Sequence, residues 1–181
     1  MDIIKDGTGS GNLAAVDGEN RLLTSAITYS GEHTANHEFE NAYNMLFEIT
    51  PTTGNCFLYL KNGHTLDISI EGLWLRTDSA EQVIMKLGDT GTPSSGSAIT
   101  PANVNAGANS TALGTFQSGN NITGLSGGTI INKGWITNTA TSFFNFEQDV
   151  IVPPNLVYTL YAVTGGVALA GTIVFNYHSH T

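Results

Sequence analysis

Cysteine, basic residues and long apolar runs are all scarce in this chain of 181 residues. Cys56 is the single cysteine, so no intrachain disulfide can form, and the class of small secreted domains held together by disulfides is excluded. Because Cys56 lies in the apolar and aromatic run of residues 56–60, we expect a small buried side chain and not a reactive thiol.

Charge is low and one-sided. Charged residues make up 12% of the chain, and 6 Lys and Arg stand against 15 Asp and Glu, which gives a formal net charge of −9. Binding to a phosphate backbone requires clustered cations, so we expect no nucleic acid partner. The low charge does not indicate disorder, because 40% of the residues are hydrophobic.

Signals for export or membrane insertion are missing. Residues 1–7 lack the basic start and the apolar stretch of a signal peptide, and no run approaches the length of a membrane span. We therefore expect synthesis in a cytoplasm and no membrane partner.

The chain is rich instead in Thr, Ser, Asn and Gly, which favour pleated strands and tight turns over long helices. Strand-like segments are expected at residues 43–50, 56–61, 66–75, 82–87, 129–136, 143–152, 156–163 and 171–177. Gly and Pro turns separate them, without a 3.6-residue periodicity. This predicts an all-β fold over residues 31–181, an antiparallel β-sandwich of the jelly-roll type.

Residues 90–128 are dense in Gly, Ser, Thr, Asn and Ala and carry few large apolar side chains. We predict long loops there with one or two short strands. A loop of that length in a compact domain is usually functional or held by a neighbour.

Residues 1–30 form a candidate assembly arm. Two short apolar stretches flank the turn at residues 17–20, which predicts a hairpin, and their apolar area is too small for a core of their own. We expect the arm to lie on another protein surface; the alternative is a hairpin that pairs with the edge of the sandwich. Its candidate contact residues are Ile3, Ile4, Leu13, Val16, Leu22 and Leu23.

Candidate metal and catalytic residues do not converge on a site. His33 and His37 are spaced i, i+4, and His178 and His180 flank Ser179, but no cysteine or convincing helix supports a metal centre. The carboxylates considered for a glycosidase pair are Glu38, Glu40, Glu48, Glu71, Glu81 and Glu147. No signature joins any two of them, so we predict no enzyme activity, metal or cofactor.

Both ends of the chain resemble a known group of proteins. Residues 4–14, with residues 16–17 and 20–22, resemble the N-terminal segment of structural proteins from tailed bacteriophages. Near the other end, similarity to the same group lies in residues 151–154, 160–165 and 171–178.

The resemblance implies a virion protein, and the size and sandwich pattern are most similar to capsid decoration (cement) proteins. Such a protein binds the major capsid protein on the outer capsid surface, bridges capsomers and stabilises the shell, typically as a homotrimer. An acidic protein suits the outer face, away from packaged nucleic acid.

A receptor- or carbohydrate-binding module of a phage tail fibre or spike is the alternative, and a non-viral lectin-like or adhesin domain is a third hypothesis. Sugar binding needs aromatic side chains exposed in a groove, for which Trp74 and Trp135 are the candidates. Both lie in strand-like runs, so we predict that they belong to the core.

Overall fold

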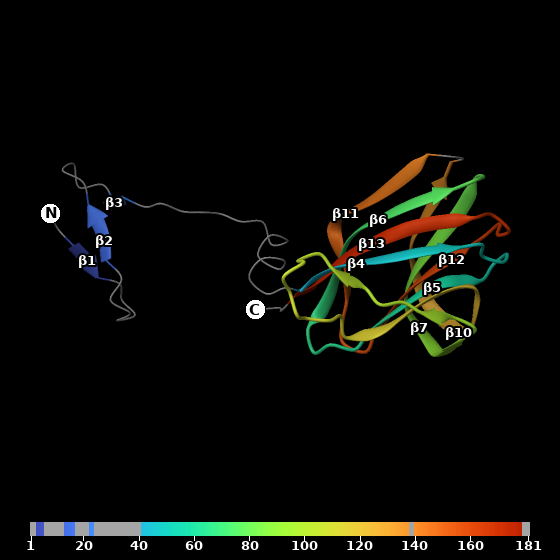
Figure 1. Cartoon of the computed structure of the whole chain (residues 1–181), viewed down its shortest axis with the longest axis horizontal. Coiled ribbons are helices and arrows are strands. Elements are labelled where there is room, and N and C mark those ends of the chain that lie inside the picture. Colours follow the sequence, from blue (N-terminus) through green and yellow to red (C-terminus); the bar gives the residue numbers. More distant parts are fainter. Residues whose placement is uncertain (1–2, 6–12, 17–21, 24–40, 138–139, 179–181) are drawn as a thin grey trace. The chain divides into compact units, whose positions relative to one another are not determined.

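The computed structural model describes residues 3–5, 13–16, 22–23, 41–137 and 140–178, with the side chains described from residue 41 onward except at 147–149. The chain divides into two compact units, Met1–Ser30 and Gly31–Thr181 (Figure 1). None of the described residues belongs to a helix with the length and apolar character needed to cross a bilayer.

The first unit contains a small antiparallel sheet in the order β1-β2-β3. Its strands are β1 (Ile3–Lys5), β2 (Leu13–Val16) and β3 (Leu22–Leu23). β2 and β3 pair as the hairpin that the sequence predicts, and β1 pairs with the other edge of β2. The assembly role of residues 1–30 stays a prediction.

The second unit is an all-β sandwich, which confirms the predicted fold class. One sheet has the order β11-β6-β13-β4-β9, and the other has the order β5-β12-β7-β10-β8. The strands of the first sheet are β4 (Ala42–Ile49), β6 (Asp67–Thr77), β9 (Ala102–Asn103), β11 (Thr141–Val152) and β13 (Leu169–His178). Those of the second sheet are β5 (Cys56–Asn62), β7 (Glu81–Ser94), β8 (Ser97–Ala98), β10 (Gly114–Ile136) and β12 (Val157–Ala162). Every strand pair is antiparallel.

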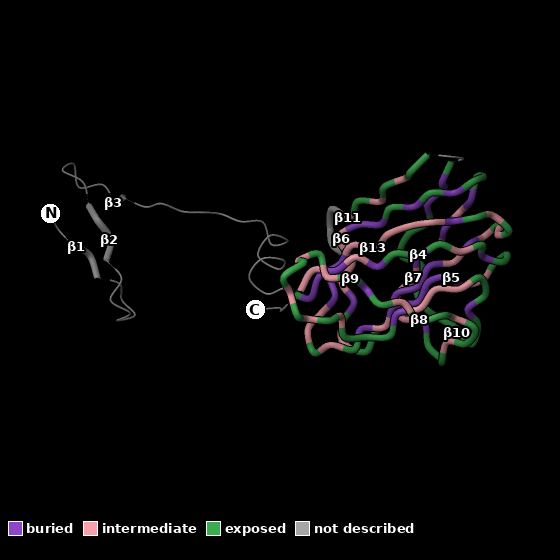
Figure 2. Tube along the Cα trace, in the orientation of Figure 1, coloured by how far each residue is buried: buried purple, intermediate pink, exposed green. Residues whose placement is uncertain are grey.

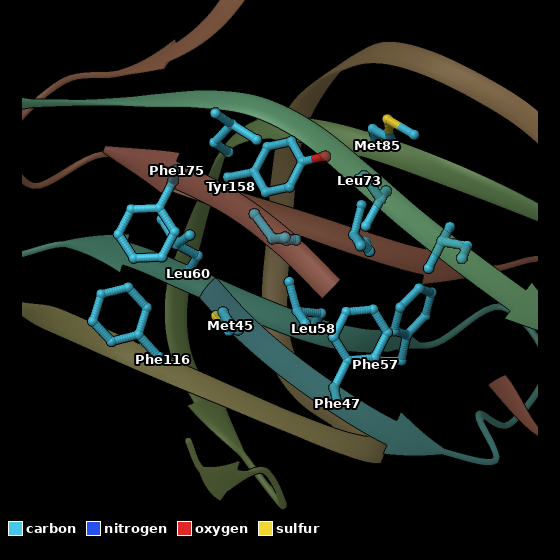
Figure 3. Packing of buried hydrophobic residues seen from close by; sticks show 14 of the residues in the cluster. Met45, Phe47, Phe57, Leu58, Leu60, Leu73, Met85, Phe116, Tyr158 and Phe175 are labelled. Carbon is cyan, nitrogen blue, oxygen red and sulfur yellow. The ribbon is translucent and has the colours of Figure 1, made fainter. Parts of the chain in front are cut away.

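The core lies between the two sheets, where alternate residues of each strand point inward. On β4, Tyr43, Met45 and Phe47 are buried, while Leu46 and Glu48 face outward. Figure 3 shows side chains from both sheets interdigitating in this layer, and Figure 2 shows the buried stretches running through the centre of the sandwich.

Strand β10 is 23 residues long and closes the second sheet on itself. Its first part pairs with β5, and its last part pairs with β7. A register shift between Ser118 and Ile122 lies within the part that pairs with β5, just before pairing with β7 begins at Thr123, as expected where a strand bends. The closure encloses a second, smaller core of Cys56, Tyr59, Ile122 and Val157.

The prediction of long loops at residues 90–128 is wrong for about half of that segment, residues 90–94 and 114–128. β7 continues to Ser94 and β10 begins at Gly114, so only residues 95–113 form a connection, which carries the short β8 and β9. The predicted strand at 129–136 is the end of β10. Pairing of β10 with β7 and β5 satisfies the backbone, whereas its largely exposed side chains leave no apolar alternation in the sequence.

Candidate binding site

The outer face of the first sheet carries a row of large side chains at one register level. Strand pairing places Leu46 opposite Thr172, Thr172 opposite Trp74, and Trp74 opposite Phe143. Leu46 is 60% exposed, Trp74 40% and Phe143 49%. The prediction that Trp74 belongs to the core is therefore wrong.

A bulge in β6 explains the outward position of Trp74. Ile68 and Ile70 point into the core, and Trp74 would share their face if alternation were unbroken. The pairing with β13 instead shifts between Val174 and Phe175, so Glu71 is an extra residue on β6. Beyond it, Leu73 and Leu75 take the inward positions and Trp74 points to solvent.

Trp74 and Phe143 stack on each other. Their ring centroids are 4.4 Å apart, and the ring planes differ by 22°. Gly72 makes room for this pair, because a Cβ at that position would lie 2.6 Å from the Phe143 ring. The stack holds the Trp74 indole in place on the outer face of the sheet.

A groove of about 490 Å³ lies beside the Trp74 indole, and we name it the Trp74 groove. Leu46 on β4 and Trp74 on β6 face each other across it, with Thr172 of β13 between them. At the next register level Glu48 and Arg76 lie on opposite sides of Ala170, and both line the groove.

A second hollow of about 470 Å³ shares Glu48 with the Trp74 groove. Its polar lining comes from Ser95, Ser97, Ser118, Asn120 and Asn121. The Asn120 Oδ1 atom accepts a hydrogen bond of 2.9 Å from the Thr50 amide. The amide group of Asn121 and the serine hydroxyls are exposed or half-buried polar groups at this end.

These groups offer stacking and hydrogen bonding to a ligand. An indole face stabilises apolar or amphipathic ligands by stacking, Glu48 accepts hydrogen bonds, and Arg76 donates them. The volume falls within the range of about 300–1,000 Å³ that is usual for ligand pockets.

The second exposed tryptophan, Trp135, lies on β10 and is 64% exposed, so its predicted core position is also wrong. Its neighbours Gly134 and Ile136 are buried, and a Cβ at Gly134 would lie 2.2 Å from the Phe144 ring. Inward alternation of these two residues turns Trp135 outward. Trp135 does not line the Trp74 groove.

The predicted contact residues all lie on β1–β3, and none of them belongs to the strands that form the Trp74 groove. They are Ile3, Ile4, Leu13, Val16, Leu22 and Leu23.

Of the four histidines considered as metal ligands, His178 is exposed at the end of β13, and His33, His37 and His180 lie outside the described residues. Within the described part of the chain, no group of three or more His, Cys, Asp or Glu is placed to hold a metal ion.

The carboxylates considered for catalysis do not form a pair in the groove. Glu48 lines it alone, Glu81 is buried, and Glu71 is half-buried and accepts a hydrogen bond from the Asn176 side chain. Glu38, Glu40 and the side chain of Glu147 lie outside the described residues.

Cys56 is buried, as predicted, in the second core. Its Sγ lies 3.1 Å from the Leu58 carbonyl oxygen, to which the thiol donates. Burial raises the pKa of the Cys56 thiol to about 12, so the reactive thiolate is disfavoured near neutral pH.

A buried polar cluster lies next to this second core. The Asp89 Oδ2 atom accepts hydrogen bonds from the hydroxyls of Thr159, at 2.6 Å, and Tyr161, at 2.8 Å. Burial raises the pKa of Tyr161, and its hydrogen bond to Asp89 adds to the shift. The Lys86 Nζ lies 4.1 Å from the Tyr161 ring centroid, whereas the Asp89 Oδ1 atom is buried and has no hydrogen-bond partner among the described residues.

Comparison with protein-family models, with curated proteins and with solved structures found no match for this chain. The chemistry of its own residues is therefore the basis for the proposals below.

Proposed function

We propose that the chain is a non-enzymatic structural protein of a virus particle, a decoration protein that binds the outer capsid surface and bridges capsomers. The observation that carries the proposal is the separate unit Met1–Ser30. Its paired strands have three, four and two residues, and sheets this small are marginally stable without a partner surface. A capsid or a neighbouring subunit supplies that surface.

The apolar character of these short strands supports the same role. Each Ile or Leu that is buried at a contact contributes roughly 1.5–3 kcal/mol before the ordering entropy is subtracted. Several of the six candidate contact residues together are enough to decide occupancy on a particle.

The strand connectivity supports the narrower assignment of the sandwich as a jelly roll. Without the short β8 and β9, the sheets are β11-β6-β13-β4 and β5-β12-β7-β10. This gives eight strands in two sheets that exchange the chain repeatedly, which is the arrangement expected of a jelly roll. Jelly rolls are frequent in capsid proteins and lectins, so the fold is compatible with both proposed classes of function.

Deletion of residues 1–28 tests the proposal. Because unit Gly31–Thr181 contains both hydrophobic cores, the truncated chain should keep a cooperative unfolding transition but lose binding to particles that lack the protein. Co-sedimentation with such particles measures the binding. Unchanged occupancy of the truncated chain would contradict the proposal.

The alternative, a receptor- or carbohydrate-binding module, is supported by a specific observation. Trp74 is exposed in a groove with polar neighbours, which is the feature that sugar binding requires.

A further inference from the structure

We propose that the Trp74 groove binds a neutral carbohydrate, with one sugar ring stacked on the indole of Trp74. This inference goes beyond capsid binding, since it concerns the sandwich and not residues 1–30. It holds whether or not the chain belongs to a virus particle.

The orientation of the Trp74 indole favours stacking of a sugar ring. Phe143 lies on β11, on the side of β6 opposite to β13, and its ring covers one face of Trp74. The other indole face lies on the side of β13, where Trp74 lines the groove together with Leu46. A sugar presents a patch of C–H groups on one face of its ring, and an aromatic face is the side chain surface that matches such a patch.

The width of the Trp74 groove suits a single sugar ring. Leu46 and Trp74 stand on strands separated by one intervening strand, so their backbones are roughly 9–10 Å apart at a strand spacing of about 4.8 Å. The intervening strand contributes the small residues Ala170, Gly171 and Thr172 to the floor. This leaves room for one ring held on edge between Leu46 and the indole.

The polar groups of the Trp74 groove are placed to bind sugar hydroxyls. Glu48 and Arg76 lie one register level from Leu46 and Trp74, and they flank the floor of the groove on both sides. A carboxylate that accepts and a guanidinium that donates can bind neighbouring hydroxyls of the same ring. The shared hollow beyond Glu48 adds serine and asparagine groups within reach of a second sugar residue.

The charge balance indicates that the ligand is neutral. The groove contributes one carboxylate and one guanidinium, so it has no excess of cations for an anionic polymer. The chain as a whole has a net charge of −9, which repels acidic glycans. Neutral hexose oligosaccharides fit both conditions.

The test uses the full chain and a panel of glucose-, galactose- and mannose-based trisaccharides, with binding measured by saturation-transfer NMR and titration calorimetry. We expect at least one trisaccharide to bind. Trp74→Ala should weaken that binding at least tenfold, and Glu48→Gln and Arg76→Gln should each weaken it severalfold. Trp135→Ala is the matched control, since it removes an exposed tryptophan outside the groove, and it should leave the affinity unchanged.

Thr172→Phe tests the groove without removing the stacking pair. A phenyl ring on the floor should block the sugar, and aromatic residues are well tolerated in strands, so the unfolding transition should be retained. Binding that survives Thr172→Phe, an equal loss in Trp135→Ala, or no binding of any trisaccharide at millimolar concentration would overturn the proposal. So would loss of particle binding in Trp74→Ala without sugar binding by the wild type, because the groove would then be a protein docking face. None of these sugar results depends on residues 1–30, so the deletion experiment stays a separate test.

Discussion

At the scale of single residues, Glu81 is a carboxylate that is almost completely buried, with 1% of its surface exposed. Its two oxygens accept hydrogen bonds of 2.8 Å from the amides of Thr164 and Gly165. Gly165 has φ of +69°, and a Cβ there would lie 2.3 Å from the Thr53 amide nitrogen. Glu81 thus fixes a turn between β12 and β13 whose backbone only glycine can follow.

We expect Glu81→Gln to destabilise the sandwich by roughly 1–3 kcal/mol, because the amide group of glutamine faces an N–H donor that the carboxylate accepted. Urea unfolding followed by circular dichroism measures the change. Glu48→Gln is the control, and as an exposed position it should stay within about 0.5 kcal/mol of the wild type. Equal stability of the two variants would contradict the structural role of Glu81.

Cys56 gives the chain a defined sensitivity to high pH. Its pKa rises from an ordinary value of 9.0 to about 12 in the folded chain, chiefly through burial. The unfolded thiol therefore ionises first as the pH rises, so the stability from the protonated thiol is full below about pH 9 and is lost progressively up to about pH 12.

We expect the stability difference between the wild type and Cys56→Ala to shrink by up to about 1.4 kcal/mol for each pH unit above 9. Urea unfolding under reducing conditions at pH 8 and pH 10.5 measures it. The native thiol should also resist a disulfide reagent at pH 8 until the protein unfolds. Labelling of the folded chain within the mixing time would show that the thiol is accessible.

At the scale of elements, the extra residue Glu71 in β6 decides which side chains face solvent. The alternation of Ile68 and Ile70 is visible in the sequence, and the buried face at that end was predicted correctly. The bulge cannot be predicted from the sequence pattern of β6. It arises from the pairing of β6 with β13 and from a register shift in its pairing with β11, between Asn145 and Val150. The exposure of Trp74, and with it the candidate site, could not be predicted for this reason.

Single-residue deletions in β6 test this account. Deleting Glu71 should leave a folded protein, because a regular ladder then joins Ile70 to Gly72 with both faces preserved. Deleting Ser69 should abolish the cooperative transition, since it either turns Ile68 to solvent or places the Glu71 carboxylate in the core. Thermal unfolding distinguishes the two variants, and equal tolerance of both deletions would contradict the assigned bulge.

The other strands show where sequence patterns are sufficient. The predicted segments 43–50 and 156–163 match β4 and β12 closely, because both are bounded by turn residues and carry large apolar side chains. The predicted segment 82–87 is shorter than β7, which continues to Ser94. A glycine with φ of +79°, Gly88, is accommodated within the paired strand. Exposed strands such as β10 are held by backbone pairing, which leaves no trace in side-chain patterning.

At the scale of the whole molecule, we expect a homotrimer, because the short strands of residues 1–30 need a partner surface and decoration proteins are typically trimers; an isologous dimer is the alternative. Among the strands that the structure describes, β11 is a 12-residue edge strand that pairs on one side only, with β6. Open edges favour pairing with another chain, and burying apolar area can overcome the repulsion between acidic copies. Light scattering after size exclusion should give three times the 19.1 kDa mass of one chain. A monomer at micromolar concentration that also appears as isolated monomers on particles would contradict the trimer.

The order of strands within the two sheets also bears on how the protein is made. β12 lies between β5 and β7, and β13 lies between β6 and β4, so the last two strands of the chain occupy interior positions in their sheets. Until both strands have been synthesised, neither sheet can be completed, and the partners of β12 and β13 present open edges. The sandwich therefore cannot close until β12 and β13 have been made, and a chain truncated before β12 is a species prone to aggregation.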